Sequence, residues 1–361
     1  MTRSKVAVLK TAPGTVLDDY GKLMRLADYG RYLPKDKDTA LKINISWHYY
    51  YPACSTPPWQ LEGVIKTLLE DGYSRDLIHA CHNKTVVVSA KRGEVANKQL
   101  PVVRKYGLRN IHLYEDGEEW VCYEPKSKMR VLHDIYPRGI EIPKRLIGEN
   151  VIHLPTMKTH VFTTMTGAMK NAFGGLLHEK RHWTHSVIHE TLVDLLAIQK
   201  EIHTGIFAVM DGTIAGDGPG PRCMVPQIKN TILASGDQVA IDAVAAKMMG
   251  FDPLSLPFIR LAHEAGLGCG DVREIEIAGE DIEGVNWHFR GDKQTFASYG
   301  QKLIYHGPLK PLETFLLRTV LAPWSYIASV IFHDYFWHPF IGRERTRCVL
   351  RTDWGKLFQS Y

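Results

Sequence analysis

The sequence Val-Ile-His-Leu-Pro-Thr-Met-Lys-Thr-His, residues 151–160, opens the segment that decides the fold of this chain. Val151–Leu154 has the apolar character of a buried strand, and Pro155 interrupts it. A polar loop is expected next, and past Gly174-Gly175 the pattern becomes helical. Open α/β sheets bind ligands in such units, where strand ends meet the free amides of a helix start. We therefore predict an α/β fold with its active site in this loop.

Polar side chains of the predicted loop are the candidate catalytic and binding residues. Histidine exchanges protons near neutral pH, and lysine can stabilise a carboxylate or enolate oxygen. We expect His160 to act together with Lys158 or Lys170 in the chemical step. Thr166 and Asn171 lie in the same stretch and are expected to bind the substrate.

A row of histidines follows at spacings of four, three and four residues: His178, His182, His185 and His189. If residues 176–203 form one helix, all four imidazoles lie on one face. They would span about 16 Å at the helical rise, so only two or three of them could share a metal ion. Two alternatives stay open. Either His178, His182 and His185 hold a transition metal, or the histidines form a polar face bonded to carboxylates, carbonyls or water.

The chain alternates between strand-like and helix-like segments from residue 5 to about residue 280. This alternation predicts a doubly wound, mostly parallel sheet with a helical C-terminal extension. We divide the chain into an N-terminal α/β half (1–150), a C-terminal α/β half (151–300) carrying the His/Lys and Asp-Gly loops, and a helical, aromatic-rich tail (301–361). The expected strands are 5–11, 40–46, 77–80, 110–114, 151–154, 206–210, 230–234 and 275–278, and the expected helices are 18–29, 59–70, 96–106, 176–203, 238–249 and 256–265.

Further candidates stand at the carboxyl ends of other expected strands, which meet at one sheet edge when the strands are parallel. His82 follows the 77–80 strand and is a catalytic or ligand candidate. Asp211 and Asp217 lie in a glycine-rich loop after the 206–210 strand, where they either anchor a ligand or only form turns. Trp47 and Tyr49 belong to an aromatic and proline-rich loop that is either a pocket wall or packed surface.

Composition limits the class of protein. The chain has 361 residues, a net charge of +5 and 45% hydrophobic residues, as expected for a globular protein that favours anionic small molecules. Basic and aromatic residues are not interleaved in one patch, so we expect no nucleic-acid partner. The six cysteines are far apart and form no Cys-x-x-Cys, so we do not expect an iron–sulfur cluster. Isolated cysteines are typical of cytosolic thiols, and we expect a cytoplasmic location by default. The first ten residues read as a strand, because their apolar run is too short for a signal peptide.

The C-terminal tail changes character. Residues 315–332 are largely apolar, but Pro323 interrupts them and they are too short for a confident membrane span. Aromatic residues and the basic run 343–347 follow. A helical extension packed on the main domain is the favoured reading, a peripheral membrane anchor is the alternative, and a homo-oligomer is compatible with both.

Several motifs together resemble domain-of-unknown-function family 362 over roughly residues 5 to 280. This resemblance implies an α/β fold with a ligand pocket. Some relatives carry an added ferredoxin module, whose cysteines this chain lacks. The matching motifs are Lys42-Ile43-Asn44, Thr56-Pro57, Leu154-Pro155-Thr156-Met157-Lys158-Thr159-His160, Met165-Thr166-Gly167-Ala168-Met169-Lys170-Asn171, Asp211-Gly212 with Gly216-Asp217-Gly218-Pro219, and Ala234-Ser235-Gly236-Asp237-Gln238-Val239-Ala240-Ile241-Asp242.

A fainter similarity runs to the nickel-dependent lactate racemases. In that family a histidine, a Pro-His loop, a Gly-Ala-Lys stretch and a later histidine follow one another. Here Met169 separates Ala168 from the lysine, so only the order of residues is similar. The residues that share this order are His82, His160, Lys170 and one of His178, His182 or His185.

Two functions of different class follow from these patterns. The leading hypothesis is a cytosolic enzyme acting on a small anionic organic substrate by His/Lys acid–base or metal-assisted chemistry, in an isomerase, lyase or redox step. The alternative is a non-catalytic ligand-binding or electron-transfer accessory protein. That alternative predicts His160 and Lys170 pointing apart, and no closed pocket between the two glycine loops. A third possibility is that the histidine-rich helix only stores or delivers metal.

Overall fold

A central sheet runs through the body of the computed structural model, which describes residues 3–83, 85, 87–115, 117–291, 296–305, 307–308, 310–312 and 323–361. The strand order is β12-β1-β11-β10-β7-β2-β3-β4, with β8 beside β10 and β9 beside β8. The strands of this sheet are β1 (Lys5–Lys10), β2 (Thr39–Ile43), β3 (Ile78–His82), β4 (Arg109–His112), β7 (Asn150–Leu154), β8 (Thr156–His160), β9 (Thr164–Met165), β10 (Gly205–Asp217), β11 (Val225–Ser235) and β12 (Glu276–Gly279).

Most of the sheet is parallel, as the sequence predicts. β10, β7, β2, β3 and β4 pair in parallel one after another, and β1 pairs in parallel with β12. β11 is the exception, because it runs antiparallel to both β1 and β10. Every residue of β2, β3 and β7 is buried, which fits central parallel strands that are covered on both faces.

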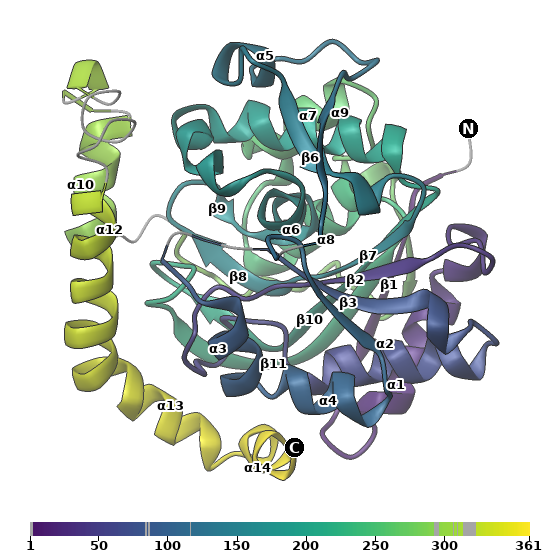
Figure 1. The fold of residues 1–361 in the computed structure, drawn as a ribbon. Helices are drawn as coiled ribbons and strands as arrows, with labels where there is room; N and C mark the ends of the chain where they lie inside the picture. Colours follow the sequence, from purple (N-terminus) through teal and green to yellow (C-terminus); the bar gives the residue numbers. More distant parts are fainter. Residues whose placement is uncertain are drawn as a thin grey trace.

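Helices cover both faces of the sheet, so the doubly wound architecture is confirmed (Figure 1). Strand residues alternate between the two resulting cores: Val6 and Val8 pack with α6 to α9, and Ala7 between them packs with α1 and α2. A small hairpin, β5 (Trp120–Tyr123) with β6 (Ile140–Pro143), lies apart from the sheet. The helices of the body are α1 (Val16–Leu26), α2 (Pro58–Glu70), α3 (Ala90–Ala96), α4 (Gln99–Lys105), α5 (Leu132–Ile135), α6 (Gly167–Leu176), α7 (Ile188–Ile202), α8 (Gln238–Met249) and α9 (Pro257–Glu264).

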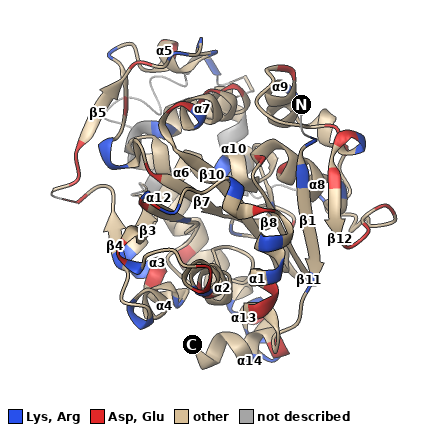
Figure 2. Ribbon diagram, turned by 90° about the vertical axis from the view of Figure 1, so that its right-hand side faces the viewer, with Lys and Arg blue, Asp and Glu red and all other residues tan. Residues whose placement is uncertain are grey.

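The C-terminal region is helical, again as predicted. After α10 (Phe296–Tyr305), helix α12 (Pro323–Val330), a π-helix (Ile331–Gly342) and α13 (Arg343–Leu350) form an arm along one side of the body, and α14 (Asp353–Ser360) ends the chain (Figure 1). The predicted apolar segment 315–332 lies partly outside the described residues. Within the described part of the chain, no helix combines the length and apolar character needed to cross a membrane. Basic and acidic residues are interspersed along the ribbon (Figure 2).

The predicted division at residue 150 coincides with the start of β7. This strand pairs with β2 of the N-terminal half on one side and with β10 of the C-terminal half on the other. The two halves therefore contribute to one continuous sheet.

The prediction of a polar loop after Pro155 is wrong for the first part of that segment, because residues 156–160 form strand β8. The preceding strand stops at Leu154, but β10 continues past it, and β8 pairs with this longer part. Buried polar side chains are tolerated there because they are hydrogen-bonded. The Thr156 hydroxyl donates to the carbonyl of Ala53 (3.0 Å), and that of Thr159 donates to the carbonyl of Gly218 (2.6 Å).

The single helix predicted over 176–203 is also wrong. Helix α6 begins at Gly167 and ends at Leu176, a 3-10 helix spans Glu179–Val187, and α7 begins only at Ile188. Side-chain hydrogen bonds to nearby carbonyls compete with regular α-helix in this connection: Thr184 Oγ1 donates to the carbonyl of Arg181 (2.9 Å), and His185 Nδ1 to that of His182 (2.8 Å). The four histidines consequently do not share one helical face.

The glycine-rich loop predicted after the 206–210 strand is replaced by a longer strand. β10 extends to Asp217 and pairs with β11 through a register shift between Gly212 and Ile214. Glycines permit this close pairing, since a Cβ added at Gly212 would lie 2.6 Å from the sulfur of Met157. Asp211 is therefore a strand residue and not part of a strand-end loop.

Candidate functional site

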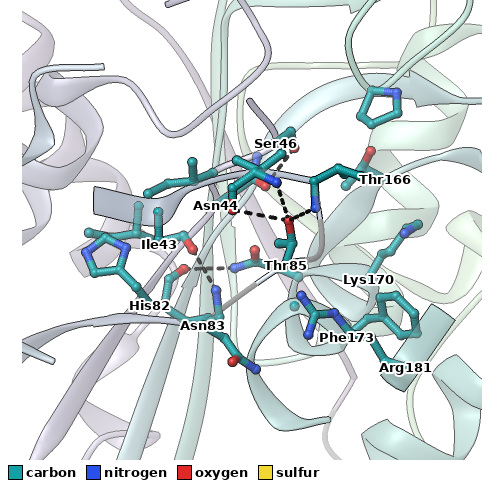
Figure 3. Close-up of a pocket in the computed structure, with 18 of the residues that line it drawn as sticks. Ile43, Asn44, Ser46, His82, Asn83, Thr85, Thr166, Lys170, Phe173 and Arg181 are labelled. Carbon is teal, nitrogen blue, oxygen red and sulfur yellow. Dashed lines mark hydrogen bonds between the residues drawn. The ribbon is translucent and has the colours of Figure 1, made fainter. Parts of the chain in front are cut away.

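A cavity of about 240 Å³ lies at the carboxyl ends of β2 and β3, beside α6 (Figure 3). Lys42 comes from the end of β2, Ser46 from the loop after it, and His82 from the end of β3. On the other side of the view stand Lys170 of α6 and Arg181 of the 3-10 helix. This is the sheet edge at which parallel α/β folds bind ligands, and the volume suits a small molecule.

The wall of the cavity is strongly basic. Four of its side chains are lysine or arginine: Lys42, Lys170, Arg181 and Arg222. Among the described residues of the wall there is no aspartate and no glutamate. Basic side chains gathered around a concave site raise the local concentration of anions, so the site is suited to an anionic ligand.

Burial makes two of these lysines weaker bases than usual. Burial and the nearby Arg181 lower the pKa of Lys42 to about 8, and its ammonium donates to the carbonyl of Ile43 (2.6 Å). Burial, together with the positive charges of Lys158 and Arg181, lowers the pKa of Lys170 to about 7. Lys170 therefore titrates near neutral pH, where it can hold an anion when protonated or accept a proton when neutral.

Two histidines of the wall are held in defined hydrogen bonds. Nδ1 of His160 accepts from the backbone amide of Phe162 (3.2 Å), which leaves the proton of the neutral ring on Nε2. Nδ1 of His185 donates to the carbonyl of His182, so its Nε2 carries the lone pair. Burial lowers the pKa of His185 to about 3, and burial with Lys170 holds the pKa of His160 well below its usual value. Both rings are neutral at pH 7.

Thr166 and Asn171 line the cavity in different ways. The hydroxyl of Thr166 is buried and has no hydrogen-bond partner among the described residues, so it is available to a ligand. The amide of Asn171 donates to the carbonyl of Lys42 (2.8 Å), which ties α6 to β2. Thr166 is therefore the better candidate for direct contact, and Asn171 maintains the wall.

The sequence analysis expected free amides at the start of the helix beside the site, but two amides in the first turn of α6 are already bonded within the protein. The carboxylate of Asp242 on α8 accepts from the amides of Ala168 (2.5 Å) and Met169 (3.0 Å). Gly167 has φ +71°, and a Cβ there would lie 2.4 Å from Asp242. Burial raises the pKa of Asp242 to about 8. An internal carboxyl group thus takes the place at this helix start that an anionic ligand would need.

The structure brings together seven of the predicted site residues and separates the others. Those in the cavity wall are His82, His160, Thr166, Lys170, Asn171, His182 and His185. The ammonium of Lys158 instead donates to Ser46 Oγ (3.2 Å) and to the carbonyl of Cys54 (2.5 Å) behind the wall.

Both predicted aspartates lie outside the wall. Asp211 is on the opposite face of the sheet, where it accepts from Tyr20 Oη (2.6 Å) and Trp59 Nε1 (3.0 Å). Asp217 accepts from the backbone amide of Arg290 (2.6 Å). Their hydrogen bonds serve the packing of the sheet with its neighbours.

The predicted aromatic wall and the first of the predicted metal histidines lie elsewhere too. Trp47 is fully buried against the C-terminal arm, with its ring 6.0 Å from that of Trp337. Tyr49 stacks on His338 of the same arm (4.5 Å). His178 stands edge-on to Trp120 (5.4 Å). The aromatic loop thus holds the arm, and His178 is not part of the cavity wall.

Sequence reasoning missed several residues of the site. Lys42 stands in an otherwise apolar buried strand, and a lysine is rarely buried without a role. Asp242 stands in a helix of which nearly every residue is buried, which is the same kind of signal. Arg181 and Arg222 have no comparable signal, because no sequence pattern around them predicts where their side chains point.

Comparisons with known proteins place this geometry in a family. Over 125 residues the chain is 30% identical to a thylakoid-associated protein of Synechocystis sp., and the match covers 32% of this chain and 37% of that protein. The chain therefore spans well under half the length of this relative. No solved structure matches the chain. The family described as domain of unknown function (DUF362) matches residues 39–247, which include β2, β3, β8 and α6 around the cavity, and the chain belongs to this family.

Proposed function

We propose that this protein is an enzyme that binds a small organic anion in the basic cavity and transfers a proton to or from it. The observation that carries the proposal is the charge of the wall: four lysine and arginine side chains and no acidic residue among the described ones. His160 and Lys170 belong to the same wall, whereas a purely accessory protein would be expected to have them pointing apart. The similarity to the nickel-dependent lactate racemases stays a prediction and is not needed here.

The pKa values suggest how the roles are divided. A general base works best when its pKa is near the working pH. Lys170, with a pKa of about 7, fits that requirement, while the neutral His160 and His185 are too weakly basic. Neutral Lys170 would take a proton from a carbon next to the carboxylate, and His160 Nε2–H would donate to the enolate oxygen so formed. Lys42, Arg181 and Arg222 would hold the anionic group.

The anion-binding step can be tested with simple probes. Isothermal titration with sulfate and inorganic phosphate should give saturable binding to the wild type, and Arg222→Gln should weaken it at least about tenfold, since a charge-assisted contact is worth about 1.5–3 kcal/mol. Lys200→Gln, which removes an exposed lysine at the end of α7, is the control and should bind like the wild type. Equal affinities in all three proteins would refute an anion site in this cavity.

The chemical step needs a separate readout. Small hydroxy and dicarboxylic acids that displace sulfate are incubated with the protein in D2O, and deuterium incorporation next to the carboxylate is followed by NMR. We expect exchange with the wild type and its loss in Lys170→Met. Binding without any exchange across the panel would favour the non-catalytic alternative.

We also propose that the protein contacts a membrane surface from the cytoplasmic side through its C-terminal arm. The arm exposes apolar side chains at helical spacing, Ile327, Ile331, Tyr335, Phe336 and Phe340, and exposed arginines follow on α13. Apolar and aromatic side chains next to basic ones suit the interface of an anionic bilayer. The association of the Synechocystis relative with thylakoids agrees with this proposal. The six cysteines are free thiols, as is usual in a reducing compartment such as the cytoplasm.

A further inference from the structure

A second cluster of polar side chains lies at the edge of the sheet, next to the cavity. His82 and His112 end the neighbouring parallel strands β3 and β4 and are direct partners in the register. Their rings therefore leave the sheet on the same face, with centroids 5.2 Å apart and 20° between the planes. Glu94 of α3 faces both, and its Oε2 lies 3.2 Å from Nε2 of each histidine.

All three side chains are buried, to 2%, 4% and 7% exposure for His82, Glu94 and His112. One ligand atom from each lies within 4.8 Å of those of the other two. Both ring nitrogens of His82 are buried, and within the described part of the chain neither makes a hydrogen bond of good geometry. Nε2 has the Glu94 carboxylate 3.2 Å away. An ion placed between these ligand atoms would satisfy Nε2 of His82 and the carboxylate together.

From this geometry we infer that His82, Glu94 and His112 bind a divalent transition-metal ion of the zinc type. Two imidazoles and one carboxylate are a ligand set that such ions accept, with a fourth position left for water or another ligand. His82 also lines the basic cavity, so this fourth position lies near the place of the proposed anion. The inference goes beyond the proposed function and does not depend on it.

Neighbouring polar groups hold two of the three proposed ligands in place. Asn110 Nδ2 donates to Glu94 Oε2 (3.0 Å), and Glu115 Oε2 lies 3.8 Å from Nδ1 of His112. Such outer contacts orient ligands in metal sites.

The test uses the untagged full-length chain, stripped with a chelator and titrated with Zn²⁺ and Co²⁺. We expect about one ion per chain with a tetrahedral Co²⁺ absorption spectrum, and a higher Tm in the presence of metal. Glu94→Gln and His112→Gln should each weaken metal binding more than about 100-fold, because the loss of a ligand lowers metal affinity more than the loss of an outer contact does. Asn110→Ala should weaken it about tenfold.

His178→Asn is the matched control, because it removes a histidine that the sequence had suggested as a ligand. It should bind metal like the wild type. Circular dichroism of the metal-free variants verifies their fold, and a folded Glu94→Gln whose Tm no longer responds to Zn²⁺ supports the site. Wild-type protein that binds no metal, Glu94→Gln that binds it unchanged, or loss of binding in His178→Asn alone would each overturn the inference. Sulfate titration of the metal-free wild type tests the proposed anion site separately, so either proposal can fail without the other.

Discussion

Lys170 owes its chemistry to burial among other cations, which lowers its pKa to about 7. Below that pH its ammonium attracts an anion, and above it the charge is lost, so anion affinity should fall as pH rises. Sulfate is a suitable probe because its own charge does not change in this range. We expect its affinity to fall up to about tenfold between pH 6 and pH 8 in the wild type. Isothermal titration at several pH values measures this slope.

Lys170→Met should bind sulfate more weakly and with little dependence on pH. Lys200→Gln should keep the wild-type slope, because Lys200 is exposed on α7 and is not part of the cavity wall. If Lys170→Met retained the slope, another group of the wall would be titrating. Lys42 has a pKa of about 8 and would be the next residue to replace.

Single residues also mark the limit of what the sequence can predict about the site. Position at a strand end identifies His82, because parallel strand ends meet at one edge, and position in the polar segment after a strand identifies His160. It fails for Asp211, whose side chain points to the opposite face, where Tyr20 and Trp59 bind it. Alternation along β10 puts Asp211 on the same face as Phe207 and Val209. The sequence analysis missed this because it ended the strand at residue 210 and expected a loop from Asp211 onward.

At the scale of elements, the 3-10 helix Glu179–Val187 decides the position of Arg181 and His185. Thr184 is buried, and its hydroxyl bonds to the carbonyl of Arg181 (2.9 Å). Thr184→Val keeps the shape and removes this bond, which should shift Arg181 and weaken sulfate binding about tenfold, or 1.4 kcal/mol. The cost in folding free energy should be about 1 kcal/mol.

A matched control lies on α7, where the buried Thr191 makes the same kind of bond to the carbonyl of Val187 (2.9 Å). Thr191→Val should lose similar stability in urea denaturation and keep the sulfate affinity of the wild type. Equal affinities for the two variants would mean that this hydrogen bond does not position Arg181.

Elements with strong periodicity were predictable, and those that depend on tertiary partners were not. The apolar spacing of 59–70 and 238–249 predicts α2 and α8 closely, since each buries a face on the sheet. β8 could not be predicted, because its polar residues are stable in a strand only beside the extended β10. The break between α6 and α7 likewise depends on side-chain bonds to the backbone, which a helical pattern of histidines conceals.

On the scale of the whole molecule, the two halves share one sheet. The C-terminal arm is attached to the loop after β2 through the carboxylate of Asp334. Trp47 Nε1 donates to Asp334 Oδ1 (2.7 Å), and His48 Nε2 lies 3.2 Å from Oδ2 of the same carboxylate. Both contacts involve buried groups, so they fix the inner side of the arm to the body. Its outer side carries Tyr335 and Phe340, each 73% exposed.

We expect this outer side to bind anionic lipid. Wild-type protein should float with vesicles of phosphatidylglycerol and phosphatidylcholine, and bind less to phosphatidylcholine alone because exposed arginines of α13 contribute. The double substitution Phe336→Ser and Phe340→Ser should weaken flotation at least about tenfold, since burial of one phenylalanine is worth about 1.5–3 kcal/mol. Ile147→Ser removes an exposed apolar side chain from the body and is the control. Self-association in analytical ultracentrifugation that the double variant abolishes, without any flotation, would show instead that a second copy of the chain covers the arm.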